Sequence, residues 1–297
     1  MNPRLAWAAA APRGRAYLEL TKPRVVALML FTAFVGMVLA PHDGPPWAAL
    51  IFGSAGIALM AASGAAANHL IDARVDALMA RTRARPLPQG LLKPAEVAGF
   101  VAGSGVTGFA LLLAYTNALC AGLTLASLLG YAVVYSIVLK PRTPQNIVIG
   151  GAAGATPPLL GWVAVTGQID ASALALVLII FIWTPAHFWA LAIHRRSEYE
   201  RAGIPMLPVT HGVAYTAARI VGYTQLLWMA SLLPWATGLG GGFYLACAIG
   251  LGARFMQLAL RLQNDGERWA MPTFRYSIVY LAGLYAALLI DHWLARG

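Results

Sequence analysis

The stretch that decides the fold is ASALALVLIIFIWTPAHFWALA, residues 171–192, which contains no Asp, Glu, Lys or Arg. At about 1.5 Å of rise per residue, a helix of this length crosses the hydrocarbon core of a bilayer, which is about 30 Å thick. Similar hydrophobic stretches lie on either side of it, and together they predict nine transmembrane spans. The spans cover residues 23–40, 47–68, 95–114, 118–139, 145–165, 171–192, 213–235, 241–261 and 274–294.

The composition of the whole chain excludes an ordinary soluble protein. Hydrophobic residues make up 59% of the sequence and charged residues 11%, whereas about 25% of the residues of a soluble domain are charged. Each span must satisfy its own backbone hydrogen bonds in lipid, so the spans are expected to be helices. We therefore predict an all-α polytopic membrane protein with one transmembrane domain over residues 1–297, of which residues 1–16 form a flexible cytoplasmic N-terminus.

The formal net charge of +10 indicates how the spans are oriented. If nine spans alternate from a cytoplasmic N-terminus, every Lys and Arg except Arg296 falls on the cytoplasmic side. Cytoplasmic loops retain Lys and Arg, so this orientation is favoured and the C-terminus is expected outside. Nucleic-acid binding is excluded, because the charge is spread over short loops with no soluble domain to present it. We predict a location in the bacterial cytoplasmic (inner) membrane.

A polar motif follows the second span. Asn68, Asp72 and Asp76 recur at four-residue spacing, so their side chains lie on one face of a helix. They offer only oxygen ligands, which suit Mg²⁺, and Mg²⁺ usually shares the phosphate oxygens of a substrate. Arg81 and Arg85 follow and can bind phosphate through forked hydrogen bonds. The motif predicts a diphosphate site; the alternative is a solvated helix end whose arginines only anchor the loop.

A second polar group stands at the end of the sixth span, on the same predicted side of the membrane. It contains His187, His194, Arg195, Glu198 and Tyr199. Two such groups, about four spans apart, predict two halves of the chain that face a shared diphosphate pocket.

The two motifs resemble those of the UbiA-type intramembrane prenyltransferases. The first motif runs from Asn68 to Gly90, and the similarity extends over residues 17–292. Within that superfamily the sequence is most similar to the haem O synthases, or protohaem IX farnesyltransferases. Four further stretches carry this similarity: TKPRV at 21–25, RTPQNIVIGGAAG at 142–154, HFWALAI at 187–193 with AGIPMLPV at 202–209, and FRYSIVY at 274–280.

The resemblance implies nine helices around a central cavity and a defined reaction. Such an enzyme transfers a farnesyl group from farnesyl diphosphate to a vinyl group of haem b, with addition of water, and produces haem O and diphosphate for terminal-oxidase haem biosynthesis. Mg²⁺ is the implied cofactor, and haem b is a substrate and not a retained cofactor. Haem A synthase and oxidase assembly factors are the implied protein partners.

The motifs and the resemblance together assign the site residues. The expected metal ligands are Asn68, Asp72, Asp76 and Glu198. The expected catalytic residues are Asp72, Asp76, Arg81, Arg85, Lys140, Arg142, Glu198 and Tyr199. The residues expected to bind diphosphate or haem are Asn68, Lys22, Arg24, Asn146, His187, His194 and Arg195.

Three of these residues need separate comment. Haem O synthases typically carry an Asp-Tyr pair in the second motif, where this sequence has Glu198 and Tyr199, so direct metal binding by Glu198 stays open. An ionisable residue inside a span, such as His187, indicates function by default. Imidazole is a common axial ligand of haem iron, and His194 lies two turns further along the same helix face. The alternative for either histidine is a neutral side chain bonded to a neighbouring helix.

Two other functions remain open at this point. One is a UbiA-type prenyltransferase that acts on a quinone-ring precursor in place of haem. The other is a secondary transporter, which also carries polar clusters and internal halves. A transporter should line both faces of a central path with charge, however, and here the carboxylates and arginines concentrate on one side.

Overall fold

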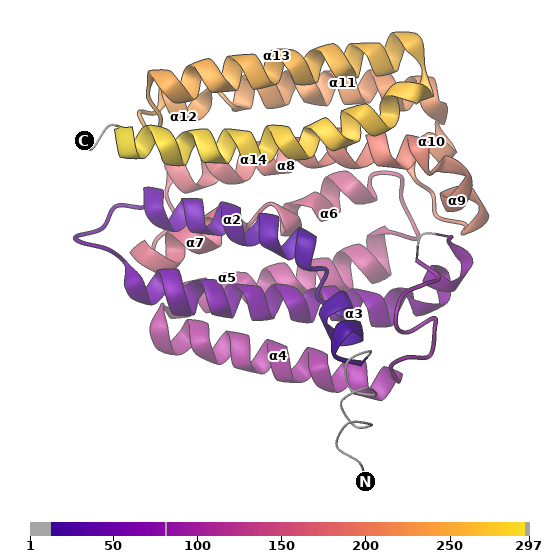
Figure 1. Cartoon of the computed structure of the whole chain (residues 1–297), viewed down its shortest axis with the longest axis horizontal. Helices are drawn as coiled ribbons and strands as arrows, with labels where there is room; N and C mark the ends of the chain where they lie inside the picture. Colours follow the sequence, from indigo (N-terminus) through magenta and orange to yellow (C-terminus); the bar gives the residue numbers. More distant parts are fainter. Residues whose placement is uncertain (1–12, 81, 295–297) are drawn as a thin grey trace.

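The computed structural model describes residues 13–80 and 82–294, and the regular structure in these residues is entirely helical, as predicted (Figure 1). A short helix over Arg13–Leu20 comes first, so residues 13–16 of the predicted flexible N-terminus are helical, and residues 1–12 lie outside the described part of the chain. The longer elements are α2 Pro23–Leu39, α3 Ser54–Leu78, α4 Pro94–Tyr115, α5 Ala118–Leu129, α6 Asn146–Gly154, α7 Pro157–Thr166, α8 Ala171–His194, α11 Gly212–Ala230, α13 Gly242–Asp265 and α14 Ala270–Leu294. The shorter ones are the π-helices η1 Ala49–Gly53 and η2 Gly130–Leu139, the 3₁₀-helix η3 Glu267–Trp269, α9 Arg196–Arg201, α10 Leu207–Thr210 and α12 Leu233–Ala236.

The helices make an integral membrane protein, but the predicted number of nine spans is not confirmed. Within the described residues, seven helical stretches are long and apolar enough to cross a membrane. An eighth results if Arg13–Leu20 and Pro23–Leu39, which meet at 47°, are counted as one span. The helix that corresponds to the remaining predicted span, α11, has only 19 residues. It carries Arg219 and Gln225 and is not among the stretches that are apolar enough to be counted.

The helices are arranged in two halves that follow the sequence. Figure 1 shows α2, α3, α4, α5 and α7 in one half and α8, α11, α13 and α14 in the other. In the first half, α3 packs along α4 and α2 along α7; in the second, α8 packs against α11 and α14, and α13 packs against the same two helices. Contacts of α14 with α2, and of α6 and α7 with α8, join the halves.

Helices α2 and α7 approach each other so closely that two glycines are required. A Cβ atom on Gly36 would lie 2.2 Å from the carbonyl oxygen of Pro158, and one on Gly161 would lie 1.9 Å from the carbonyl oxygen of Ala33. Small residues let backbones come together in membranes, where helices are held by van der Waals packing and not by exclusion of water. The close crossing fixes α2 against the rest of the bundle. It thereby also fixes Lys22, the residue that precedes α2.

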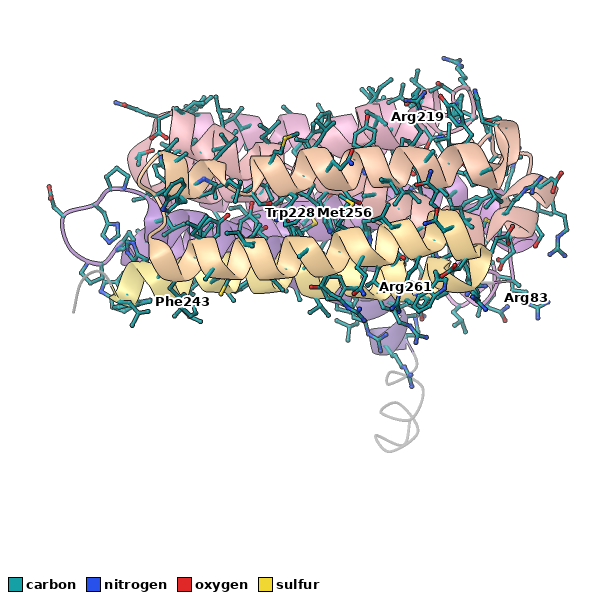
Figure 2. All side chains as sticks on the ribbon, turned by 90° about the horizontal axis from the view of Figure 1, so that it is seen from above. Arg83, Arg219, Trp228, Phe243, Met256 and Arg261 are labelled. Atoms are coloured by element: carbon teal, nitrogen blue, oxygen red, sulfur yellow. The ribbon has the colours of Figure 1, made fainter. Side chains whose placement is uncertain are left out.

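The outer helices present apolar side chains to the surroundings of the protein. In the most apolar windows of α4 and of the continuous helix α5–η2, only 22% and 17% of the residues are buried inside the protein. Val106, Leu113, Val133 and Ile137 are among the exposed ones. A continuous apolar surface of this extent is expected to face lipid. Figure 2 shows Arg83, Arg219 and Arg261 toward one end of the bundle and Phe243 toward the other.

Two local features differ from the predicted spans. The second span was predicted to end at residue 68, but α3 continues to Leu78, so Asp72 and Asp76 lie on the same uninterrupted helix. The fifth span is broken into α6 and α7, because Pro157 at the start of α7 cannot continue the hydrogen bonding of α6. The first feature bears on the polar site, which lies at the ends of α3 and η2.

Candidate active site

Three oxygen-bearing side chains lie on one face of the last turns of α3. Asn68, Asp72 and Asp76 are only 4%, 6% and 3% exposed. The Asn68 amide Nδ2 donates to Asp72 Oδ2 over 2.8 Å, as four-residue spacing on a helix allows. Charged groups buried to this degree must be paired or must bind a cation.

Basic side chains from three separate segments converge on this face. Lys140, at the end of η2, donates to Asp72 Oδ2 over 2.6 Å. Arg85, from the loop after α3, donates to Asp76 Oδ2 over 2.6 Å. Lys22, which precedes α2, donates to Asn68 Oδ1 over 2.5 Å. Three of the residues that were assigned to the site, Lys22, Arg85 and Lys140, therefore lie together at the first motif.

The local backbone explains how Lys22 reaches the site. Lys22 has φ 50° and ψ 59°, the left-handed conformation, and it is the sole non-glycine residue with positive φ in the described part of the chain. The following residue, Pro23, disfavours the right-handed helical conformation at Lys22 and begins α2. The break directs the Lys22 ammonium toward Asn68 and the Tyr131 hydroxyl, 3.1 Å away. A strained residue of this kind costs of order 1–3 kcal/mol and is typical of functional sites.

Sequence reasoning missed three residues that support the cluster. Tyr131 and Ser136 belong to η2, and the Asn68 amide also donates to Ser136 Oγ over 3.0 Å. Thr82 donates to the backbone oxygen of Asp76 over 2.9 Å and so holds the loop that carries Arg85. Tyr131 and Ser136 stand in a hydrophobic run where no polar motif marks them, and their inward direction depends on the wider turn of the π-helix.

The second polar group is organised differently. The guanidinium of Arg195 donates to Glu198 over 2.5 Å, a pair three residues apart. Tyr199 is buried near the ring of Phe188, whereas His194 is exposed at the end of α8. Within residues 13–80 and 82–294 there is no group of three or more His, Cys, Asp or Glu side chains that could hold a metal. Glu198 is paired with Arg195, and its predicted role as a metal ligand opposite Asp72 and Asp76 stays a prediction.

His187 lies in an aromatic stack between α8 and α14. Its ring is 4.1 Å from the ring of Trp183 on one side and 4.6 Å from that of Phe274 on the other. Its Nδ1 is 2.6 Å from Ser277 Oγ, and the Trp183 indole donates to the Ser277 carbonyl over 2.8 Å. The stretches 187–193 and 274–280, which the sequence singled out separately, therefore meet at this histidine.

Comparison with known proteins decides the family. A model of the UbiA prenyltransferase family matches residues 29–287. The chain belongs to the UbiA prenyltransferase family. It is 60% identical over 281 residues to a protoheme IX farnesyltransferase of Alkalilimnicola ehrlichii, covering 94% of this chain and 93% of the relative. It is 59% identical to the one of Azotobacter vinelandii, covering 94% of each. The chain thus also belongs to the protoheme IX farnesyltransferases within the UbiA family.

Solved structures confirm the UbiA fold. A UbiA homologue from Aeropyrum pernix K1 superposes with a TM-score of 0.72 at 20% identity, covering 93% of this chain and 98% of that one. A UbiA homologue from Archaeoglobus fulgidus bound to GPP and Mg²⁺ gives a TM-score of 0.61 at 16% identity, covering 92% and 99%.

The UbiA family implies a magnesium site, and the α3 face fits one in its donor chemistry. Asn68, Asp72 and Asp76 are buried, oxygen-only donors on one helix face. Mg²⁺ needs few protein ligands, because waters and substrate phosphates complete its octahedral shell. The three basic residues that now contact these oxygens are also the groups that a diphosphate would attract.

Other residues that the UbiA resemblance assigned are not part of this cluster. Arg24 and Arg142 are exposed. Asn146 is fully buried, and its amide donates to the Thr143 carbonyl over 2.6 Å, while its Oδ1 has no hydrogen-bond partner among the described residues. Arg81 lies outside the described residues.

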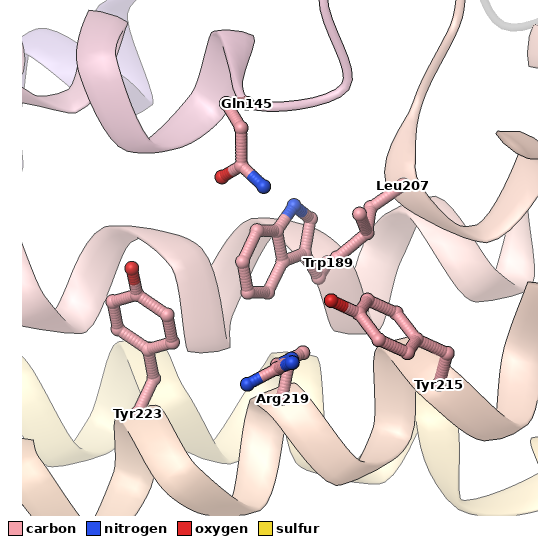
Figure 3. Close-up of a pocket in the computed structure, with 6 residues that line it drawn as sticks. All are labelled: Gln145, Trp189, Leu207, Tyr215, Arg219 and Tyr223. Carbon is pink, nitrogen blue, oxygen red and sulfur yellow. The ribbon is translucent and has the colours of Figure 1, made fainter. Parts of the chain in front are cut away.

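A small pocket in this UbiA fold was not predicted from the sequence. It has a volume of about 160 Å³ and lies between α8, α11 and the segments before α6 and at α10 (Figure 3). In the sequence, Arg219 stands out only as part of the charge that indicates orientation. The residues that line the pocket are Gln145, Trp189, Leu207, Tyr215, Arg219 and Tyr223.

Proposed function

We propose that this chain transfers the farnesyl group of farnesyl diphosphate to a vinyl group of haem b, with addition of water, to give haem O and diphosphate. The observation that carries the proposal is the convergence of Lys22, Arg85 and Lys140 on the buried Asn68–Asp72–Asp76 face. The names of the relatives at 59–60% identity support the acceptor and the donor. GPP and Mg²⁺ in the Archaeoglobus fulgidus homologue support a prenyl diphosphate and a metal in this fold.

The basic residues act on the leaving group. As the bond between C1 of the farnesyl group and the diphosphate oxygen breaks, the electron pair leaves with the diphosphate. Arg85 and Lys140, with Arg81 and Arg142 from the adjoining segments, neutralise the charge that develops on its oxygens. Cations that are already in place stabilise such charge without reorganisation. Bound Mg²⁺, held by Asn68, Asp72 and Asp76, would supply further positive charge to the same oxygens.

The interior of the bundle protects the cation that remains on the farnesyl group. Water would quench an allylic cation, so C1 must react in a site that excludes bulk water. The vinyl group of the acceptor attacks C1 and forms the new carbon–carbon bond. The positive charge then lies on the former vinyl carbon that is attached to the porphyrin ring. This carbon binds the oxygen of one water molecule, and the bound water loses a proton to leave a hydroxyl group. No nucleophilic side chain is required.

His187 is proposed to bind the acceptor. Trp183 and Phe274 cover the two faces of its ring and fix its direction, while Ser277 engages Nδ1. Axial ligation of iron uses a ring nitrogen in the plane of the imidazole, so the stack does not obstruct it. With Nδ1 engaged, Nε2 is the nitrogen we assign to the iron.

The membrane orientation is proposed from the charges. The polar cluster, the loop after η2 and the segment around α9 carry the basic residues, and cytoplasmic segments retain such residues. We place the N-terminus and these segments in the cytoplasm and the C-terminus outside, in a bacterial inner membrane. Haem A synthase and oxidase assembly factors follow as candidate partners, because they act on the product.

Product analysis tests the proposed function. Membranes containing the chain are incubated with farnesyl diphosphate, haem b and Mg²⁺, and the haems are analysed by mass spectrometry. We expect haem b to gain a hydroxyethylfarnesyl group, and we expect a chelator to stop the reaction until Mg²⁺ is restored. A prenylated quinone precursor formed in place of haem O would identify a different acceptor. Transport of a solute with no release of diphosphate would contradict the enzyme altogether.

A further inference from the structure

The pocket between α8 and α11 is lined by hydrogen-bond donors. Tyr215 and Tyr223 contribute hydroxyl groups, Gln145 an amide, Arg219 a guanidinium and Trp189 an indole N–H. None of the described residues that line the pocket is a carboxylate. All five side chains can donate hydrogen bonds, and arginine and tryptophan can only donate. A pocket built in this way favours an anion.

Two of its donors are available for a ligand. Trp189 is 1% exposed, and its Nε1 has no hydrogen-bond partner among the described residues. Figure 3 shows this nitrogen directed toward the side chain of Gln145, across the pocket. Arg219 forms no ion pair with any carboxylate in the described part of the chain. Its guanidinium instead stacks 4.7 Å from the centre of the Tyr215 ring, which holds it at the pocket. An unpaired buried donor is uncommon in native proteins and calls for an explanation.

The size of the pocket limits the ligand to a small group. Its volume of about 160 Å³ accommodates a carboxylate with a short alkyl arm but does not enclose a porphyrin ring. Haem b carries two propionate groups of this kind. We infer that this pocket binds a propionate carboxylate of the acceptor, with Arg219 and Trp189 Nε1 as its main donors. This inference rests on the proposed function, since it takes haem b as the acceptor.

The pocket adjoins the segment that carries Lys140, a member of the diphosphate cluster. Gln145 follows Lys140 by five residues, so their Cα atoms are separated by at most about 18 Å. Lys140 contacts Asp72 in the diphosphate cluster. Haem b carries its propionates and its vinyl groups at different edges of one rigid ring, so an anchored propionate would direct a vinyl edge away from the pocket. The pocket thus serves as a positioning site for the acceptor.

Haem and its diester separate this role from a structural one. The purified full-length protein is titrated with haem b and with haem b dimethyl ester, in which both carboxylates are blocked, and binding is followed by the Soret absorbance. We expect the wild type to bind haem b at least about tenfold more tightly than the ester, the effect of one charge-assisted interaction. Arg219→Gln should lose this preference while it keeps its affinity for farnesyl diphosphate. Trp189→Phe, which removes only the N–H, should reduce the preference by a smaller factor.

Arg261→Gln is the matched control. Arg261 also stacks 4.7 Å from an aromatic ring, that of Trp269, but it does not line the pocket, so this variant should keep the wild-type preference. Equal binding of haem b and its ester by the wild type, or an unchanged preference in Arg219→Gln, would overturn the inference. A third result would also overturn it: phosphatidylglycerol competes in a manner that requires Arg219, while the preference for haem b over its ester does not require Arg219. A lipid headgroup would then be the ligand of the pocket. Failure of the wild type to bind either haem would instead contradict the proposed function.

Discussion

The polar groups at the ends of α3 and α8 are both charged, but they are held by different kinds of contact. Asp72 and Asp76 are paired with Lys140 and Arg85, which lie 68 and nine residues away in the sequence. Glu198 is paired with Arg195 within a single helical turn. The first group therefore exists only when the bundle has folded, whereas the second is largely a local product of the helix. Because its buried carboxylates are paired with basic groups from outside their own helix, we expect the α3 end to be the reactive one.

The largest expected effect is the loss of activity at α3. Asp72→Asn removes one negative charge and one anionic oxygen ligand from the cluster, so we expect haem O formation to fall at least about 100-fold. The measurement is haem O per amount of membrane-inserted protein. Asp265→Asn, at the exposed end of α13, is the control and should retain wild-type activity. Wild-type turnover by Asp72→Asn would contradict the view that the polar group at the end of α3, and not the one at the end of α8, is the reactive one.

The next prediction concerns stability. Lys140→Gln leaves the Asp72 carboxylate buried without its ammonium partner, which typically costs about 3–5 kcal/mol. Arg195→Gln removes a more exposed pair and should cost at most about 1 kcal/mol. The measurement for both variants is the free energy of unfolding of the detergent-solubilised protein. The double variant Lys140→Gln with Asp72→Asn should recover much of the loss, and equal destabilisation by Lys140→Gln and Arg195→Gln would show that the two groups are not different.

A smaller and more selective effect is expected at His187. His187→Phe keeps the stack with Trp183 and Phe274 but removes the ring nitrogens, so haem affinity should fall about tenfold or more while farnesyl diphosphate affinity stays unchanged. Spectroscopic titration gives the first quantity and a diphosphate-binding assay the second. A parallel loss of both affinities would assign His187 a structural role.

The smallest effect on activity is expected at Glu198. Glu198→Gln keeps a hydrogen bond to Arg195 and removes only charge, so we expect activity to fall by about tenfold or less, as for a residue that orients its neighbours. Haem O formation at several Mg²⁺ concentrations checks this. A loss as large as that of Asp72→Asn, overcome by high Mg²⁺, would make Glu198 a metal ligand and remove the difference between the two groups.

Much of the architecture could be predicted because lipid imposes a simple rule of length and hydropathy. The predicted span at α11, which carries Arg219 and Gln225, is not confirmed, and the rule could not detect the break before Pro157. The Asn68–Asp72–Asp76 face was predictable because its geometry is contained in one helix. The partners of that face were suggested by motif similarity, whereas Ser136 and Tyr131 depend on the π-helical geometry of η2. The role of Glu198 stays a prediction, because sequence spacing carries no information on which helix ends meet.

The contacts of the α3 cluster have a consequence for electroneutrality. Among the described groups that contact one another there, Lys22, Arg85 and Lys140 balance Asp72 and Asp76 and leave a single formal positive charge. A trivalent diphosphate accompanied by one divalent cation carries a single formal negative charge. The two sets of charges would cancel on binding, so we expect the substrate to enter by exchanging counter-ions with groups that are already paired. In the protein without substrate, the basic groups pair with the carboxylates in place of a metal, and the carboxylates pair with the basic groups in place of a phosphate. Neither the free protein nor the protein with bound substrate would then hold a large uncompensated charge beside the lipid.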